Sequence, residues 1–173
     1  MAAPNAAVPV KHKPRPAHAA REHTTGLMDN VVTWLLRSRL HGMVSPWLML
    51  VTCTGRKSGK TYTTPVTYIK SGDEVVFFNS HTWWHNFESR SPVTLRIKGR
   101  DLRGTALAVP DPYEAEPVVR AFLEEKGVRS AWMLGVKLKA KTMPGREELA
   151  RAIAAGHTVM VRVRPSNRTP IEI

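Results

Sequence analysis

The stretch of residues 52–68, TCTGRKSGKTYTTPVTY, is the part of the sequence that most constrains the fold. An apolar run at 47–51 leads into a turn bracketed by Gly55 and Gly59, and a second run rich in Thr, Tyr and Val follows. Two such runs joined by a short glycine-containing turn predict a β-hairpin. The turn carries Arg56, Lys57 and Lys60, and backbone N–H groups in a glycine turn can also face an anion. We therefore expect a loop that binds phosphate or carboxylate, with a solvated basic turn as the alternative.

A nucleotide-binding P-loop is the nearest competing interpretation of this turn, because Gly59, Lys60 and Thr61 match the end of that motif. Only three residues separate Gly55 from Gly59, whereas the P-loop motif has four at this place. The residues after Thr61 have a β-type composition, where a P-loop requires a helix with its N-terminus toward the phosphates. The sequence therefore argues against a P-loop.

The rest of the chain continues the β pattern and adds helices. Further strands are expected at 62–69, 74–79, 93–98, 102–109 and 158–164, with turns at 71–73 and 99–101. A short helix is expected at 80–87 and longer ones at 111–126 and 144–156, whereas 130–141 fits either strand or loop. Pro65 cannot donate a ladder hydrogen bond, so it marks an edge or a bulge. About six hairpin-connected strands predict a mainly β fold, a six-stranded antiparallel barrel with peripheral helices.

The two ends of the chain differ from this pattern. Residues 1–25 are rich in Ala, Pro, His and basic side chains and predict a disordered basic tail. Residues 26–165 form the single expected domain, and 166–173 a polar tail. Within the domain, 27–44 has the periodicity of an amphipathic helix. We expect this helix to pack on the barrel or on a partner subunit, with peripheral contact to an anionic membrane as the alternative.

Composition narrows the functional classes. The net charge of +12 favours an anionic partner without choosing among a cofactor, nucleic acid and a membrane surface. The single cysteine, Cys53, lies in an apolar run, which suits a buried small hydrophobe in a reducing cytoplasm. There is no G-x-G-x-x-G motif, no βαβ alternation and no nucleophile elbow. Rossmann-type dinucleotide binding and hydrolysis are therefore not expected.

Several motifs in order lead to a resemblance. TGRKSG is followed by TTPV and a strand, a Gly72–Asp73 turn, a β run ending at Asn79, and WWHNF at 83–87. Over about residues 47–109 the chain resembles the deazaflavin-dependent nitroreductase and quinone reductase family. The resemblance implies a split β-barrel like that of FMN-binding proteins, and coenzyme F420 as hydride donor to a quinone- or nitro-type acceptor.

The resemblance also implies which residues hold the coenzyme. Its anionic tail would meet the basic loop, its ring the backbone of the second strand, and the WWHNF segment would frame the pocket. Lys60 is added to this set because it lies beside the loop. The expected cofactor-binding residues are Arg56, Lys57, Ser58, Gly59, Lys60, Thr64, Pro65, Val66, Trp83, Trp84 and Asn86. The expected substrate-pocket residues are Tyr62, Tyr68, His81 and His85, chosen for their nearness to the loop or to the WWHNF segment.

The sequence leaves some alternatives open. His81 and His85 have the i, i+4 spacing of a metal pair, but no third ligand is evident, so we expect no metal. The family's aromatic C-terminal pocket segment has no match in 128–164, so the resemblance does not identify the acceptor. An FMN- or haem-binding split barrel is the alternative within the class. A non-enzymatic polyanion-binding protein is the alternative outside it, although we expect no specific nucleic acid partner; a homodimer is also open.

Overall fold

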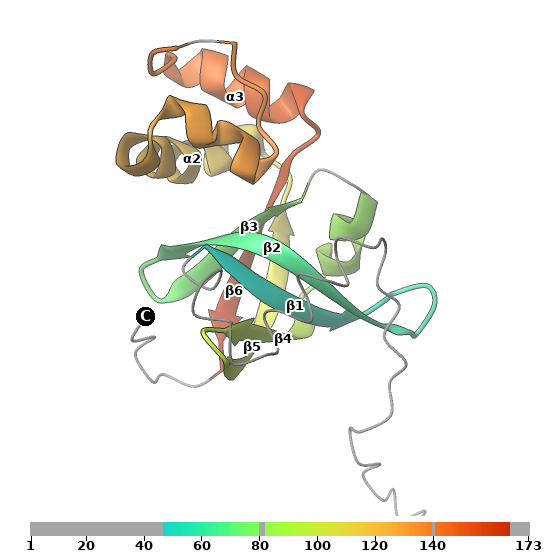
Figure 1. Cartoon of the computed structure of the whole chain (residues 1–173). Helices are drawn as coiled ribbons and strands as arrows, with labels where there is room; N and C mark the ends of the chain where they lie inside the picture. Colours follow the sequence, from blue (N-terminus) through green and yellow to red (C-terminus); the bar gives the residue numbers. More distant parts are fainter. Residues whose placement is uncertain (1–46, 80–81, 140, 167–173) are drawn as a thin grey trace, which may run out of the picture.

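A computed structural model describes residues 47–79, 82–139 and 141–166, and within them the chain forms a closed antiparallel β-barrel. The strands follow one another around the barrel in the order β1-β2-β3-β6-β5-β4, and β4 pairs with β1 to close it (Figure 1). The expected six-stranded antiparallel barrel with peripheral helices is therefore confirmed. The strands are β1 Leu48–Thr54, β2 Thr61–Ser71, β3 Glu74–Asn79, β4 Ser91–Ile97, β5 Arg100–Val109 and β6 Val159–Pro165.

The hairpin between β4 and β5 is tighter than the sequence indicated. Ile97 pairs with Arg100, so the turn consists of Lys98 and Gly99, which have φ angles of 47° and 77°. Positive φ at both central residues is the geometry of a two-residue hairpin turn, and glycine adopts it without steric cost. The expected turn at 99–101 is thus wrong by about one residue, because Arg100 already belongs to the ladder.

The helices follow the capping signals. α2, Pro112–Lys126, begins after Asp111, whose carboxylate accepts a hydrogen bond of 2.8 Å from the Tyr113 backbone N–H. Pro117 lies inside this helix without displacing its start. In the stretch at 130–141 that fitted either strand or loop, residues 130–134 belong to a 3-10 helix, whereas 135–139 have no regular structure, as the loop alternative expected. The other helices are the 3-10 helices η2 Thr82–Phe87 and η3 Val128–Leu134, and α3 Arg146–Ala155.

Two apolar clusters hold these elements together. One fills the barrel and includes Val75 and Phe77 of β3, while the other includes Val76 and Phe78 of the same strand and packs against α2, η3 and α3. Successive strand residues point to opposite faces, so β3 is buried on both sides. Figure 1 shows α2 and α3 together beyond one end of the barrel. The continuous apolar run at 75–78 is therefore explained by a strand between two cores.

The second strand has one free edge within the described chain. Residues 61–67 of β2 pair with β1, whereas β2 pairs with β3 only from Tyr68 to Ser71. Pro65 lies in the part that β3 does not cover, as expected for a residue that cannot donate to a ladder. Backbone groups of this edge are left for another partner.

Several expectations fall outside the described residues. The tail at 1–25, the helix at 27–44, His81 and nearly all of the tail at 166–173 belong to this group and stay predictions. In the part of the chain that the structure describes, no helix is long and apolar enough to cross a membrane.

Candidate functional site

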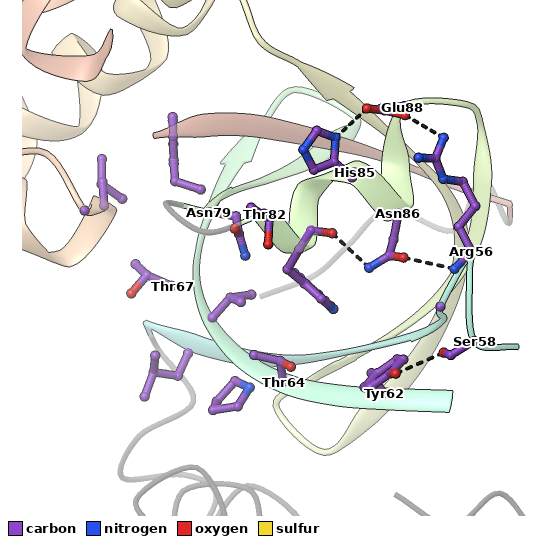
Figure 2. A pocket seen from close by; sticks show the side chains of 18 of the residues that line it. Arg56, Ser58, Tyr62, Thr64, Thr67, Asn79, Thr82, His85, Asn86 and Glu88 are labelled. Carbon is purple, nitrogen blue, oxygen red and sulfur yellow. Dashed lines mark hydrogen bonds and ion pairs between the residues drawn. The ribbon is translucent and has the colours of Figure 1, made fainter. Parts of the chain in front are cut away.

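A cavity of about 1170 Å³ lies against the free edge of β2. The loop between β1 and β2 forms one wall, η2 another, and the end of η3 a third (Figure 2). The cavity thus brings together segments from three distant parts of the sequence. From the loop come Gly55, Arg56, Lys57 and Ser58; from β2 Tyr62, Thr64, Pro65, Val66 and Thr67; from η2 Thr82, Trp83, His85 and Asn86; and from η3 and its C-cap Met133, Leu134 and Gly135.

The basic loop is compact. The Gly55 N–H donates to the Lys60 carbonyl at 2.8 Å, and the Gly59 N–H donates to the Gly55 carbonyl at 2.9 Å. Gly55 is required for steric reasons, since a Cβ there would lie 2.5 Å from Cε2 of Tyr62 and 2.7 Å from Oγ of Ser58. The Ser58 and Tyr62 hydroxyls are themselves hydrogen-bonded at 2.9 Å. The loop therefore closes onto the tyrosine ring and has one well-defined shape.

Asn86 attaches this loop to η2. Its Oδ1 accepts from the Arg56 backbone N–H at 3.0 Å, and its Nδ2 donates to the Trp83 carbonyl at 2.9 Å. The Ser91 hydroxyl donates to the Asn86 carbonyl at 2.7 Å. One amide side chain thus fixes the relative position of two cavity walls.

Glu88, which was not among the expected site residues, provides a second attachment. Its carboxylate accepts from the Arg56 guanidinium at 2.6 Å and also contacts Nδ1 of His85 (Figure 2). The hydrogen bond from His85, together with the Arg56 charge, holds the pKa of Glu88 below its ordinary value. The carboxylate is therefore ionised at neutral pH and neutralises part of the charge of the basic loop.

The two neighbouring tryptophans have different surroundings, as expected from their successive positions. Trp83 lines the cavity and packs edge-on against Phe87, with ring centroids 5.0 Å apart. Trp84 stacks on His85 at a centroid separation of 3.9 Å and does not line the cavity. Trp83 therefore joins the barrel core to the cavity wall.

Most of the residues expected at the site line this one cavity. Gly59, Lys60 and Trp84 are near it without lining it. Tyr68 is placed differently: its side chain is buried in the barrel cluster, where burial raises the pKa of its phenol. Its position along β2 explains this, because Tyr68 pairs with Phe77 of β3 and so lies beyond the open edge that lines the cavity. The expected residues that do line the cavity are Arg56, Lys57, Ser58, Tyr62, Thr64, Pro65, Val66, Trp83, His85 and Asn86.

Other lining residues were missed. Glu88 had a faint signal, its i, i+3 spacing from His85. Met133, Leu134 and Gly135 had none, because only the tertiary fold brings η3 to β2. The remaining missed residues are Leu48, Gly55, Thr67, Phe78, Asn79 and Thr82.

Other reactive groups of the described chain contribute little to the site. Cys53 is buried in the barrel, and burial raises the pKa of its thiol to about 11, so it is a neutral packing residue as expected. In 47–79, 82–139 and 141–166, no three His, Cys, Asp or Glu side chains gather where they could bind a metal ion.

Comparison with solved structures returns barrels of low sequence identity. An F420 reductase is 15% identical, with 70% of this chain and 88% of that chain covered and a TM-score of 0.39. An FAD-binding protein from Mesorhizobium loti is 17% identical, covering 75% and 91%, with a TM-score of 0.41. A pyridoxamine 5'-phosphate oxidase-related, FMN-binding protein from Nostoc punctiforme is 8% identical, covering 83% of each chain, with a TM-score of 0.46.

Comparison with protein families is decisive. No curated protein matches the chain. The family model described as F420H(2)-dependent quinone reductase matches residues 4–132, which include both the basic loop and the WWHNF segment. The matched region also extends beyond the window of about 47–109 in which the motifs were evident. The chain belongs to the F420H(2)-dependent quinone reductase family and is an oxidoreductase.

Proposed function

We propose that the protein transfers hydride from reduced coenzyme F420 to an electron-poor organic acceptor of the quinone or nitro type. The observation that carries this proposal is the joining, in one cavity, of a basic loop, a free strand edge and an aromatic wall. The cavity volume of about 1170 Å³ exceeds the roughly 300–1,000 Å³ of typical small-molecule sites. It is therefore large enough for a coenzyme and an acceptor together.

The residues of the cavity fit a ligand with an anionic end and a flat ring. Lys57 lines the cavity and has no hydrogen bond or ion pair within the described chain, so its charge is available to an anion. The backbone at 64–66 lies on the strand edge that β3 leaves open and would border the ring. Bound F420 would supply the hydride, and the protein would bind and orient the two reactants.

The acceptor would lie toward η3. Met133 and Leu134 form an apolar wall there, with Leu134 buried and Met133 partly exposed. An apolar wall favours a flat, weakly solvated molecule and excludes water from the face at which hydride moves. We assign no residue as an acid or base, and the proposed role of the chain is positioning.

Anaerobic turnover tests this function. The full-length protein is mixed with reduced F420 and a soluble quinone, and the absorbance of the oxidised coenzyme is followed. We expect F420 oxidation that requires both protein and quinone, and no acceleration above the protein-free reaction when reduced FMN replaces F420. Protein-dependent acceleration with reduced FMN and none with reduced F420 would instead assign the cavity to a flavin. Failure with both donors would contradict the proposed reaction.

We also propose that the protein acts in the cytoplasm, because its single cysteine is a buried packing residue and not part of a disulfide. Contact of residues 27–44 with anionic membranes stays a prediction from the sequence. Co-sedimentation with phosphatidylserine vesicles would test it, using protein that lacks residues 1–44 as the control.

A further inference from the structure

Arg56 is held against η2 by two separate bonds. Its backbone N–H donates to Oδ1 of Asn86 at 3.0 Å, and its guanidinium donates to Oε2 of Glu88 at 2.6 Å. Figure 2 shows Asn86 and Glu88 on the η2 side of the cavity and Arg56 reaching both from the loop. Arg56 therefore connects two walls of the cavity.

Glu88 is fully engaged in this arrangement. One carboxylate oxygen accepts from Arg56 and the other contacts Nδ1 of His85. A carboxylate with one cationic or polar partner on each oxygen has a defined orientation. The Glu88 side chain is therefore a fixed acceptor for the guanidinium.

The cations of the basic loop consequently differ in availability. The Arg56 charge is matched by Glu88, whereas Lys57 and Lys60 have no ion pair in the part of the chain that the structure describes. Of these two lysines, only Lys57 lines the cavity. An incoming anion therefore meets an unpaired Lys57 and an Arg56 that already has a counter-ion.

We propose that Glu88 is a positioning residue that holds the basic loop through Arg56, so that Lys57 is the cation that binds the anionic end of the ligand. This rests on the proposed function and refines it, since the family resemblance suggested that Arg56 and Lys57 act alike. In the opposite arrangement, the Arg56 guanidinium would separate from Glu88 and bind the anion. Glu88 would then compete with the anion for Arg56. The two arrangements predict opposite effects of removing Glu88.

A double-mutant cycle on coenzyme affinity separates them. The dissociation constant of F420 is measured for wild type, Arg56→Ala, Glu88→Ala and the double variant. We expect each single change to raise Kd several-fold and the double change to raise it no further than the larger single one. An unchanged or lower Kd for Glu88→Ala, or double-variant losses that multiply, would overturn the proposal.

Lys57→Ala extends the cycle. Because Glu88 is proposed to act by holding the loop that carries Lys57, Glu88→Ala should raise Kd by a smaller factor in the Lys57→Ala background than in wild type. Losses that multiply would show that Glu88 does not act through Lys57. Exposed ion pairs contribute little to global stability, so at neutral pH Glu88→Ala should lower the thermal midpoint only slightly. In turnover, the KM for reduced F420 should rise while kcat at saturation is kept. A lower kcat with an unchanged KM would contradict a role in positioning the loop.

Hydrogen exchange tests the proposal without any ligand. Because the Arg56 N–H is bonded to Asn86, its amide should be protected in wild type. Arg56→Ala and Glu88→Ala should both speed exchange in peptides covering residues 55–60, and by a similar factor. Unchanged exchange in Glu88→Ala would overturn the role of Glu88, even if wild-type protein failed to bind F420 and the proposed function were wrong.

Discussion

Replacement of Gly55 by alanine tests whether the basic loop has the closed shape described above. The new Cβ would lie 2.5 Å from Cε2 of Tyr62 and 2.7 Å from Oγ of Ser58. Carbon atoms in ordinary contact are about 3.5–4.0 Å apart, so the ring or the loop must move by about 1 Å. Overpacking of this kind typically costs about 1–3 kcal/mol. We expect that loss in the free energy of unfolding, together with a rise of about tenfold or more in the F420 Kd as the loop is displaced.

Urea denaturation and coenzyme titration of the same preparations measure both effects. Gly145→Ala is the control, because a Cβ there meets no atom within 4 Å and the φ angle is −62°. Its cost should stay within about 1 kcal/mol, since Gly145 is only the N-cap of α3. If Gly55→Ala were as stable as this control and bound coenzyme normally, the loop would be freely adaptable and our description of it would be wrong.

Three further predictions concern charge, packing and pH. Lys57→Ala should weaken F420 binding by about 1.5–3 kcal/mol, or ten- to a hundredfold. Replacement of the exposed Arg103 by alanine should raise the F420 Kd less than tenfold, because distant charges are screened beyond about 8 Å. Equal losses of affinity in titrations of the two variants would indicate a diffuse basic surface. Phe87→Ala should cost about 3–5 kcal/mol in urea denaturation, since Phe87 is 0% exposed; a loss below about 1 kcal/mol would contradict its place in the core. Because the pKa of Glu88 is lowered in the fold, its ion pairs stabilise the protein above the ordinary pKa of the carboxyl and are lost as pH falls through the lowered pKa. The difference in thermal midpoint between wild type and Glu88→Ala should therefore shrink from pH 7 to pH 3. A constant difference would argue against these ion pairs.

The fold was predictable because its signals are local. Glycine turns separate alternating apolar residues, and Asp111 with Pro112 marks a helix start, so most strands and helices follow from short windows of sequence. The β4–β5 turn was displaced by about one residue because Lys98 has positive φ, which a lysine rarely adopts. Local signals therefore identify elements well and their ends less well.

The site was predictable only where it is made of consecutive residues. The loop and the WWHNF segment were recognisable as units, and most of their expected residues line the cavity. Met133 and Leu134 reach it through the packing of η3 on β3, which no short window reveals. Arg56 and Glu88, which form an ion pair, are 32 positions apart in the sequence. The sequence therefore suggested a basic loop with all its cations unpaired, whereas in the structure Glu88 neutralises part of the loop's charge.

The most direct test of the account is a fluorescence titration of F420 with the purified full-length protein, repeated with FMN. If the cavity is the coenzyme site, F420 fluorescence should be quenched or shifted with saturation at micromolar protein, and FMN should bind more weakly. Lys57→Ala should move the F420 curve to higher concentrations and leave its end point unchanged. Tighter binding of FMN than of F420, or no response to either, would contradict the assignment of this cavity to F420.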